Sequence, residues 1–337
     1  MKAVGYRQSL PISDPSSLLD VELPDPRPEG RDLLVSVKAV SVNPVDTKVR
    51  MRYKPASGET KVLGWDASGV VLEAGPHATL FKAGDEIWYA GSIARPGTNS
   101  ALHLVDERIV GRKPVSLDHA RAAAMPLTAI TAWELLFERF NIQPGKHHTG
   151  DSLLVVGAAG GVGSILVQLA RHLTGLTIIG TASRDETAQW VRQLGAHHVI
   201  DHSKPLSAEL RRAGLAPPTH VAGLTHTGEH YPEIVEALAP QGHLALIDDP
   251  DSINIDLMKR KSLSLHWEFM FTRSFFGTHD MIAQHRLLCE IADLVDGGAV
   301  RTTFGQHFGT INADNLKRAH TLIESGKAKG KIVLEGF

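Results

Sequence analysis

The sequence predicts an α/β protein of two domains, in which a doubly wound parallel sheet is joined to a β-rich module. The 337 residues exceed the length of one ordinary hydrophobic core, which favours about two domains. Residues 1–125 contain short β-type runs that are separated by turns. From residue 127 onward strand and helix patterns alternate, and this alternation favours a parallel sheet with right-handed crossovers.

The N-terminal part is expected to be rich in strands. The run DLLVSVKAVSV at 32–42 alternates apolar and polar residues as a half-buried strand does. Runs at 63–75 and 83–91 are bounded by glycines and continue this pattern, with no long amphipathic helix among them. The first helical pattern begins near Asp118, an N-cap candidate, and Pro126 is expected to stop it.

The remaining chain reads as repeated strand and helix units. An amphipathic helix is expected at 128–141 before the first strand, and a later one at 279–298 after the last strand of the sheet. Strands are expected at 153–156, 176–184, 197–202, 219–226, 243–249 and 263–272, with helices after the first, second and fourth of them.

A glycine-rich turn follows the first of these strands, in the stretch SLLVVGAAGGVGSILVQLARHLTG at 152–175. Glycines allow a tight turn and a close approach of a ligand to the backbone, and the free N–H groups at the helix start favour an anion. We therefore expect a dinucleotide pyrophosphate here, although a purely structural turn is the alternative. The expected contacts are the backbones of Gly160, Gly161, Val162 and Gly163.

The end of the second strand indicates which dinucleotide binds. An acidic side chain there usually holds the ribose of a cofactor that lacks the 2′-phosphate, but this chain has Ala182, Ser183 and Arg184. A hydroxyl and a guanidinium offer charge-assisted hydrogen bonds to a phosphate. NADPH is therefore favoured over NADH, and the alternative is an ordinary surface arginine at a helix start.

Composition excludes several classes of protein. The formal net charge is −2 and no basic block stands out, so nucleic acid and anionic membranes are not expected partners. No apolar run approaches the roughly 20 residues of a membrane span, and the first residues lack the apolar core of a signal peptide, so we expect a cytoplasmic protein. Cys289 is the single cysteine, which excludes an intramolecular disulfide and a cysteine-rich zinc site.

Four segments together resemble the medium-chain dehydrogenase/reductase superfamily. They are SVNPVDTKVR at 41–50, LGWDASGVV at 63–71, AGDEIWY at 83–89 and GAAGGVGS at 157–164. The chain looks most like the zinc-independent NADPH:quinone oxidoreductases and bacterial members labelled zinc-type alcohol dehydrogenase-like, along nearly its whole length. The likeness implies a homodimer with a GroES-like catalytic domain at 1–126 and 272–337 and a Rossmann NADP(H)-binding domain at 127–271.

The zinc positions of the similar alcohol dehydrogenases are not kept. A cysteine of those enzymes corresponds to Asn43, and a histidine and a glutamate correspond to Trp65 and Asp66. A further cysteine would stand near Met125 or Pro126, and the cysteines of the structural zinc lobe are also missing. Catalytic zinc needs about three ligands from Cys, His, Asp or Glu. The comparison therefore implies a protein without zinc.

The 18 histidines do not change this expectation. His226 and His230 lie in a loop-like stretch that lacks the carboxylate of a helical zinc motif. His197 and His198 are neighbours on an expected strand, so their side chains point to opposite faces. We expect no metal-binding site.

Chemistry without a Lewis acid favours a conjugated acceptor, because a quinone or an α,β-unsaturated carbonyl delocalises the charge that hydride brings. The protein must orient the substrate and donate a hydrogen bond to the developing oxyanion. Candidate donors are Asn43, Tyr53 and Tyr89, and Trp65 is expected to wall the pocket. The alternatives are a turn-forming asparagine, a core tryptophan and ordinary half-buried tyrosines.

Other residues are expected to contact the cofactor. Thr128 and Thr131 are candidates for the nicotinamide ribose or a phosphate, and His202 is placed near the adenosine phosphate by the resemblance. Phe271 on the last strand and Lys331 near the C-terminus are weaker candidates, whose alternatives are a structural strand residue and a solvated lysine.

The sequence thus predicts hydride transfer from NADPH to a small molecule, a quinone or a conjugated enone. A 2-alkenal or enoyl reductase is the nearest alternative enzyme. An NADPH-binding sensor or structural protein with little turnover is the alternative outside enzymes. A homodimer is expected because edge strands of the parallel sheet can pair across a two-fold axis.

Overall fold

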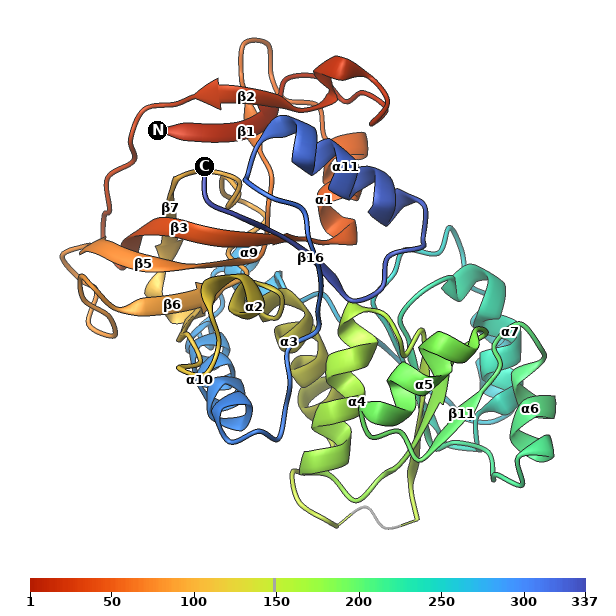
Figure 1. The fold of residues 1–337 in the computed structure, drawn as a ribbon. Helices are drawn as coiled ribbons and strands as arrows, with labels where there is room; N and C mark the ends of the chain where they lie inside the picture. Colours follow the sequence, from red (N-terminus) through yellow and green to blue (C-terminus); the bar gives the residue numbers. More distant parts are fainter. Residues whose placement is uncertain (148–149) are drawn as a thin grey trace. The chain divides into compact units, whose positions relative to one another are not determined.

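The computed structural model describes residues 1–147 and 150–337. These residues form two compact units, Met1–Ile130 with Phe271–Phe337 and Thr131–Met270. The first unit joins the two ends of the chain, and Figure 1 shows the C-terminal strand β16 beside the N-terminal strand β3.

A seven-stranded sheet forms the centre of the first unit. Its order is β15-β16-β3-β5-β6-β8, and β7 also pairs with β3. The long strand Asp32–Val42 alternates buried and partly exposed residues along its first half, as its sequence pattern predicts. The strands are β3 (Asp32–Val42), β5 (Ala67–Ala74), β6 (Glu86–Tyr89), β7 (Leu102–Asp106), β8 (Val110–Arg112), β15 (Phe304–His307) and β16 (Lys331–Glu335).

The register of β16 brings the end of the chain to the end of β3. These strands are antiparallel, and Ile332 lies opposite Val42. Lys331 therefore lies next to the residue that follows β3, which is Asn43. A second, three-stranded sheet in this unit has the order β2-β1-β4, from β1 (Lys2–Tyr6), β2 (Leu19–Glu22) and β4 (Lys61–Val62).

The first unit contains a helix that the sequence analysis did not predict, α1 (Pro44–Arg52). The residues of α1 are mostly polar, so its sequence lacks the apolar periodicity from which a helix is predicted. The local signal was Pro44 at the first helical position and Asp46 at the third, because both are typical of helix starts. The other helices of this unit are α2 (His119–Ala123), α9 (Thr272–Phe276), α10 (Ile282–Asp296) and α11 (Ala313–Glu324).

The second unit is a sheet of six parallel strands in the order β11-β10-β9-β12-β13-β14. This is a doubly wound order. The first strand, β9, is central, β10 and β11 follow on one side of it, and the chain then crosses back to place β12, β13 and β14 on the other side. The predicted α/β fold is therefore confirmed. The strands are β9 (Ser152–Val156), β10 (Thr177–Thr181), β11 (His198–Ile200), β12 (His220–Gly223), β13 (His243–Leu246) and β14 (Ser264–Trp267).

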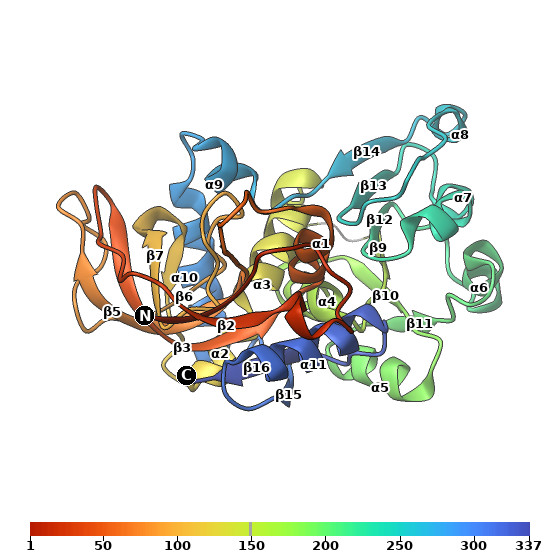
Figure 2. The same cartoon turned by 90° about the horizontal axis from the view of Figure 1, so that it is seen from above.

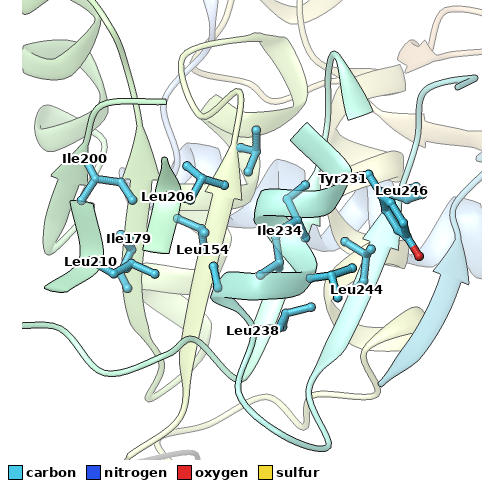
Figure 3. Close-up of a cluster of buried hydrophobic side chains, with 14 of the residues drawn as sticks. Leu154, Ile179, Ile200, Leu206, Leu210, Tyr231, Ile234, Leu238, Leu244 and Leu246 are labelled. Carbon is cyan, nitrogen blue, oxygen red and sulfur yellow. The ribbon is translucent and has the colours of Figure 1, made fainter. Parts of the chain in front are cut away.

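Helices cover both faces of this sheet. Figure 2 shows α4 on one side of the strands and α6 and α7 on the other. Figure 3 shows the core beneath α6 and α7, where Leu154 and Leu244 of the sheet meet Leu206 and Ile234 of the helices. The helices are α4 (Gly161–Leu173), α5 (Asp185–Gln193), α6 (Leu206–Arg212), α7 (Thr227–Ala237) and α8 (Asp256–Lys259), of which α6 and α8 were not predicted.

Two predicted elements differ from the expectation. The last strand ends at Trp267 rather than at residue 272, and Phe271 already has helical backbone angles before α9. Phe271 is thus not a strand residue; the apolar run that suggested a long strand continues through the turn. The helix predicted at 128–141 consists of α3 (Pro126–Trp133) and a π-helical segment, Glu134–Arg139. Among the described residues, no helix has the length and apolar character needed to cross a membrane.

Candidate functional site

The glycine-rich turn lies between β9 and α4. Gly157 has a φ of +86°, which favours glycine, and Gly160 is the N-cap of α4. Gly160 donates its backbone N–H to the carbonyl of Gly157 over 3.1 Å. The first N–H groups of a helix have no partner within the helix, so this turn can bind an anion at the backbones of Gly161 and Val162.

Close packing explains why residue 163 is a glycine, and it also explains how Ala158 fits where the usual pattern has a glycine. A Cβ on Gly163 would lie 2.5 Å from the carbonyl oxygen of Gly157 and 2.6 Å from the Cα of Ala158. Ala158 itself is completely buried, and a Cβ on Gly180 of β10 would lie 3.1 Å from its side chain. The small residue at 180 therefore makes room for Ala158 in the turn.

The strands β10 and β11 end beside this turn. Ser183 and Arg184 follow β10 and are exposed, and Arg184 is the N-cap residue of α5. His202 follows β11, and its Nδ1 lies 3.1 Å from Oγ1 of Thr181. The same Thr181 oxygen accepts the backbone N–H of Gly157 over 3.1 Å. One threonine thus connects the glycine turn with the ends of both strands.

A buried carboxylate, Asp66, organises the other candidate site, which lies in the first unit. Its Oδ2 accepts hydrogen bonds from Ser41 Oγ at 2.9 Å, Asn43 Nδ2 at 2.8 Å and Lys331 Nζ at 2.9 Å. Its Oδ1 accepts the backbone N–H of Leu127 at 2.7 Å. Asp66 is 0% exposed and Lys331 is 4% exposed. Lys331 is thus not the solvated lysine that was considered as its alternative.

Asn43 belongs to the same buried network. Its Nδ2 donates to Asp66 and also lies 3.4 Å from the carbonyl oxygen of Trp65, and its Oδ1 accepts from Lys331 Nζ. Its backbone N–H donates to Asp46 Oδ2 over 2.7 Å. Asn43 and Asp46 therefore start α1, which confirms the interpretation of Asp46 as a helix-cap carboxylate. Every polar group of Asn43 that faces this network is engaged with the protein itself.

Asp46 is a second buried carboxylate beside one ammonium. Burial raises the pKa of Asp46 to about 7, while the backbone N–H of Asn43 and the charge of Lys331 oppose this shift. Its Oδ1 is buried without a hydrogen-bond partner among the described residues. Asp46 is therefore protonated in a large part of the molecules near neutral pH.

Two predicted aromatic residues are buried in the first unit. Trp65 is 1% exposed, donates its Nε1 to the carbonyl of Ser92 over 3.2 Å, and meets Phe271 edge to face at 6.1 Å. Tyr89 is completely buried, with its hydroxyl 3.0 Å from Nδ1 of His103. Because Nε2 of His103 lies 3.0 Å from a backbone carbonyl, Nε2 carries the proton and Nδ1 accepts the Tyr89 hydroxyl.

The environment of this pair keeps both groups neutral. Burial raises the pKa of Tyr89 and lowers the pKa of His103 to about 4. In contrast, Tyr53 lies at the end of α1 with 49% of its surface exposed, and Lys61 Nζ is 5.2 Å from its ring. Among the three predicted donors, Tyr53 is the exposed one.

The two predicted threonines lie one turn apart on α3. Both side chains are buried, and Thr128 Oγ1 donates to the carbonyl of Met125 over 2.9 Å. Residues three apart on a helix share a face, so Thr128 and Thr131 lie on the same side of α3. Leu127, at the start of the same helix, is the residue that donates its backbone N–H to Asp66.

Comparison with known proteins identifies two family matches along the chain. Residues 29–111 match the alcohol dehydrogenase GroES-like domain, and residues 194–334 match the zinc-binding dehydrogenase family. A zinc-type alcohol dehydrogenase-like protein of Staphylococcus aureus is 37% identical over 339 residues, which covers 99% of both chains. The chain belongs to the medium-chain dehydrogenase/reductase superfamily. It is an oxidoreductase of this type, with the GroES-like and Rossmann-type domains that the resemblance implied.

Solved structures and a human relative agree with this assignment. A candidate zinc-dependent alcohol dehydrogenase from Rhizobium etli is 58% identical, with a TM-score of 0.96 over 100% of this chain and 98% of the other. A mycobacterial quinone oxidoreductase is 26% identical, with a TM-score of 0.80 over 99% of both chains. The human mitochondrial NAD(P)H oxidoreductase is 31% identical over 90% of this chain and 81% of its own.

The names of several relatives imply a zinc ion, and we tested whether the buried network fits one. Both carboxylate oxygens of Asp66 already accept hydrogen bonds, and an ammonium group lies where a cation would meet Asp66 and Asn43. Asn43 and Trp65 supply neither thiolate nor imidazole. Within the described residues, no three His, Cys, Asp or Glu side chains gather into a metal site. The network as it stands does not fit zinc.

The raised pKa of Asp46 leads to a prediction for the Asp46→Asn variant. Because the folded chain holds this proton up to about pH 7 and the unfolded chain only to about pH 4, the folded state binds more protons between these values. The free energy of unfolding of the parent protein therefore falls as pH rises through this window. Asparagine keeps an acceptor for the Asn43 N–H and does not titrate, so the variant gains about 1–4 kcal/mol relative to the parent across it.

Denaturant unfolding at several pH values measures this difference. The matched control is Asp314→Asn on α11, whose side chain is 91% exposed. Parallel pH curves for the Asp46→Asn variant and the parent protein would contradict the prediction.

Proposed function

We propose that this protein transfers hydride from NADPH to a quinone or a conjugated enone, without using zinc. The observation that carries this proposal is the closed network in which Lys331 is bonded to Asn43 and Asp66, two residues that the resemblance places at zinc-ligand positions of similar alcohol dehydrogenases. An unactivated ketone concentrates the transferred charge on its oxygen, where a Lewis acid such as zinc would stabilise it. A conjugated acceptor needs less help, because its π-system carries the charge to the oxygen.

The proposed cofactor site is the edge of the six-stranded sheet. The backbones at Gly160, Gly161 and Val162 would bind the pyrophosphate at the start of α4. The exposed pair Ser183 and Arg184 supports NADPH rather than NADH, because the position before it is the apolar Ala182 instead of a carboxylate. The human relative is named for either reduced nicotinamide cofactor, which fits a cofactor of this class.

The proposed proton or hydrogen-bond donor to the substrate is Tyr53. The amide hydrogens of Asn43 have acceptors in the buried network, and the hydroxyl of Tyr89 donates to His103. Asn43 then acts as a positioning residue that fixes the start of α1, while Tyr53 at the other end of α1 presents an exposed phenol. Trp65 packs with Phe271 and would give the substrate site an apolar wall.

A quinone panel and an enal panel test this reaction. Stopped-flow mixing of the NADPH-bound protein with quinones is expected to oxidise NADPH well above the rate in buffer, and metal analysis is expected to find no stoichiometric zinc. Tyr53→Phe is expected to lower the rate at least about tenfold, because general-acid assistance contributes about 10²–10⁴. Tyr231→Phe, which removes a hydroxyl bonded to the carbonyl of Asn254, is the matched control.

The panels also separate the alternatives. Faster oxidation by 2-alkenals or enoyl substrates than by quinones would favour an alkenal or enoyl reductase. Tight NADPH binding without oxidation by either panel would make the protein an NADPH-binding sensor or structural protein, and it would overturn the enzymatic proposal.

Arg184→Ala tests the cofactor preference. Loss of a guanidinium from the 2′-phosphate removes charge-assisted hydrogen bonds, so the Kd for NADPH is expected to rise about tenfold or more while the Kd for NADH stays nearly constant. Arg192→Ala, an exposed arginine in the last turn of α5, is the matched control. Equal affinities of the parent protein for NADPH and NADH would contradict the assignment of Ser183 and Arg184.

A homodimer is part of the same proposal. The strand β14 is at the edge of its sheet, and Trp267 and Phe269 at its end are 50% and 47% exposed. An edge strand with apolar side chains can pair with the same strand of a second copy across a two-fold axis. Sedimentation is expected to give twice the chain mass, and Trp267→Lys is expected to shift the protein toward the monomer. A monomeric parent protein would refute this part.

A further inference from the structure

Three histidines come together at the edge of the six-stranded sheet where the strands end. His202 follows β11, His226 precedes α7, and His230 lies in the first turns of α7. The rings of His202 and His230 are 5.9 Å apart and nearly perpendicular. Both side chains are partly buried, whereas His226 is exposed. The site described above uses only the first of these three residues.

The register of the sheet places this cluster beside the proposed phosphate site. Strands β10 and β11 are parallel, and Thr181 lies opposite Ile200. Two residues further along each strand are Ser183 and His202, so they leave the same edge side by side. The hydrogen bond between His202 Nδ1 and Thr181 Oγ1 holds the imidazole at the end of β10, and the same oxygen accepts the backbone N–H of Gly157 in the glycine turn. Among the described residues, the other ring nitrogen, Nε2, makes no hydrogen bond.

The carboxylates nearest to the cluster are engaged elsewhere or exposed. Asp201 accepts from the backbone N–H and the hydroxyl of Ser203 and pairs with Lys204. Asp248 accepts from the backbone N–H and the hydroxyl of Thr227. Glu229 is exposed on α7. Among the ion pairs of the described residues, none joins His202, His226 or His230 to a carboxylate.

His226 adds a backbone feature at the same edge. It has a φ of +50° although it is not glycine, and its Nδ1 lies 2.8 Å from Thr225 Oγ1. A left-handed conformation in a non-glycine residue is uncommon and is held only where the surroundings determine it. This conformation begins α7, the helix that carries His230.

We propose that His202 and His230 form the proton-accepting part of the 2′-phosphate site, so that NADPH binding takes up a proton from solvent and NADH binding does not. This inference rests on the proposed use of NADPH. The 2′-phosphate dianion is the only added charge that distinguishes the two cofactors. An imidazole that gains a proton becomes a second donor and a cation, and it then pairs with this dianion.

The electrostatics of the free protein favour such a proton uptake. Burial lowers the pKa of His202 and of His230, and the neighbouring histidines lower each of them further. Asp201 opposes the shift at His202, and Glu229 and Asp248 oppose it at His230. A bound phosphate dianion reverses the balance and raises the pKa of both. Affinity for NADPH therefore rises as pH falls between the free and bound pKa values.

Isothermal titration calorimetry of the full-length protein tests this directly. Binding of NADPH and of NADH is measured at about pH 7 in phosphate-free buffers that differ in ionisation enthalpy, which gives the number of protons taken up. We expect about one proton for NADPH and about none for NADH. The ratio of the two Kd values is expected to change about tenfold between about pH 6.5 and about pH 8, with NADPH favoured at the lower pH.

Variants identify the residues. His202→Gln and His230→Gln each are expected to lower the proton uptake to about half, and the double substitution is expected to remove most of it while NADPH still binds. His198→Gln, an exposed histidine at the start of the same strand β11, is the matched control and is expected to keep it. Phosphorus NMR of bound NADPH measures whether the 2′-phosphate itself changes protonation over this pH range, and no change is expected.

The outcomes separate this inference from the proposed function. The inference would be overturned if the Kd for NADPH depended on pH no more steeply than the Kd for NADH. It would also be overturned if proton uptake survived both substitutions. Either result would leave the NADPH-dependent reaction intact. Proton uptake by a protein that oxidises NADPH with neither panel would support the inference and refute the reaction. A protein that does not bind NADPH would refute both.

Discussion

The ion pair between Asp66 and Lys331 is the constraint on which the first unit depends. Each of these buried charges alone would cost several kcal/mol, and the cost is offset only where the pair is close and its other lone pairs are satisfied. Here the carboxylate accepts four hydrogen bonds, from Ser41, Asn43, Leu127 and Lys331. These donors come from the end of β3, the residue before α1, the start of α3 and the start of β16. The ion pair therefore ties the last strand of the chain to the start of α1, whose caps are Asn43 and Tyr53, and to the start of α3.

The network also explains why the chemistry of Asn43 differs from its first interpretation. An asparagine with free amide hydrogens could donate to an oxyanion. The side-chain amide of Asn43 instead donates to Asp66 and to the carbonyl of Trp65, and its oxygen accepts from Lys331. Lys331 is bonded to Asp66, and its charge also acts on Asp46, so the site is electrically balanced when Asp46 keeps its proton. A closed and balanced network is suited to holding α1 in place. In the proposed reaction, its contribution is to fix the position of α1 and so of Tyr53 at the end of that helix.

The sequence was informative where signals are local. Alternating strands and helices predicted the parallel sheet, and the glycines predicted the turn before α4, because both patterns depend on residues near one another. The pairing of Lys331 with Asp66 joins residues 265 apart in the sequence, and no local pattern carries such a contact. The helix α1 has too few apolar residues to show a periodicity. The apolar run that ends at Phe271 is ambiguous, because buried strands and buried turns have the same composition.

Lys331 in the first unit and the basic residues at the ends of β10 and β11 in the second unit differ in how far the fold neutralises them, and this difference bears on the proposed cofactor preference. In the first unit the ammonium of Lys331 already binds two acceptors and is 4% exposed, so its charge is largely neutralised within the fold. In the second unit Arg184 is exposed, and the imidazoles of His202 and His230 have no carboxylate bound to them among the described ion pairs. An unneutralised cation recognises an added phosphate far better than one that already has a partner. The proposed preference for NADPH is therefore better supported by the residues at the ends of β10 and β11 than by Lys331, whose ammonium is already bound within the fold.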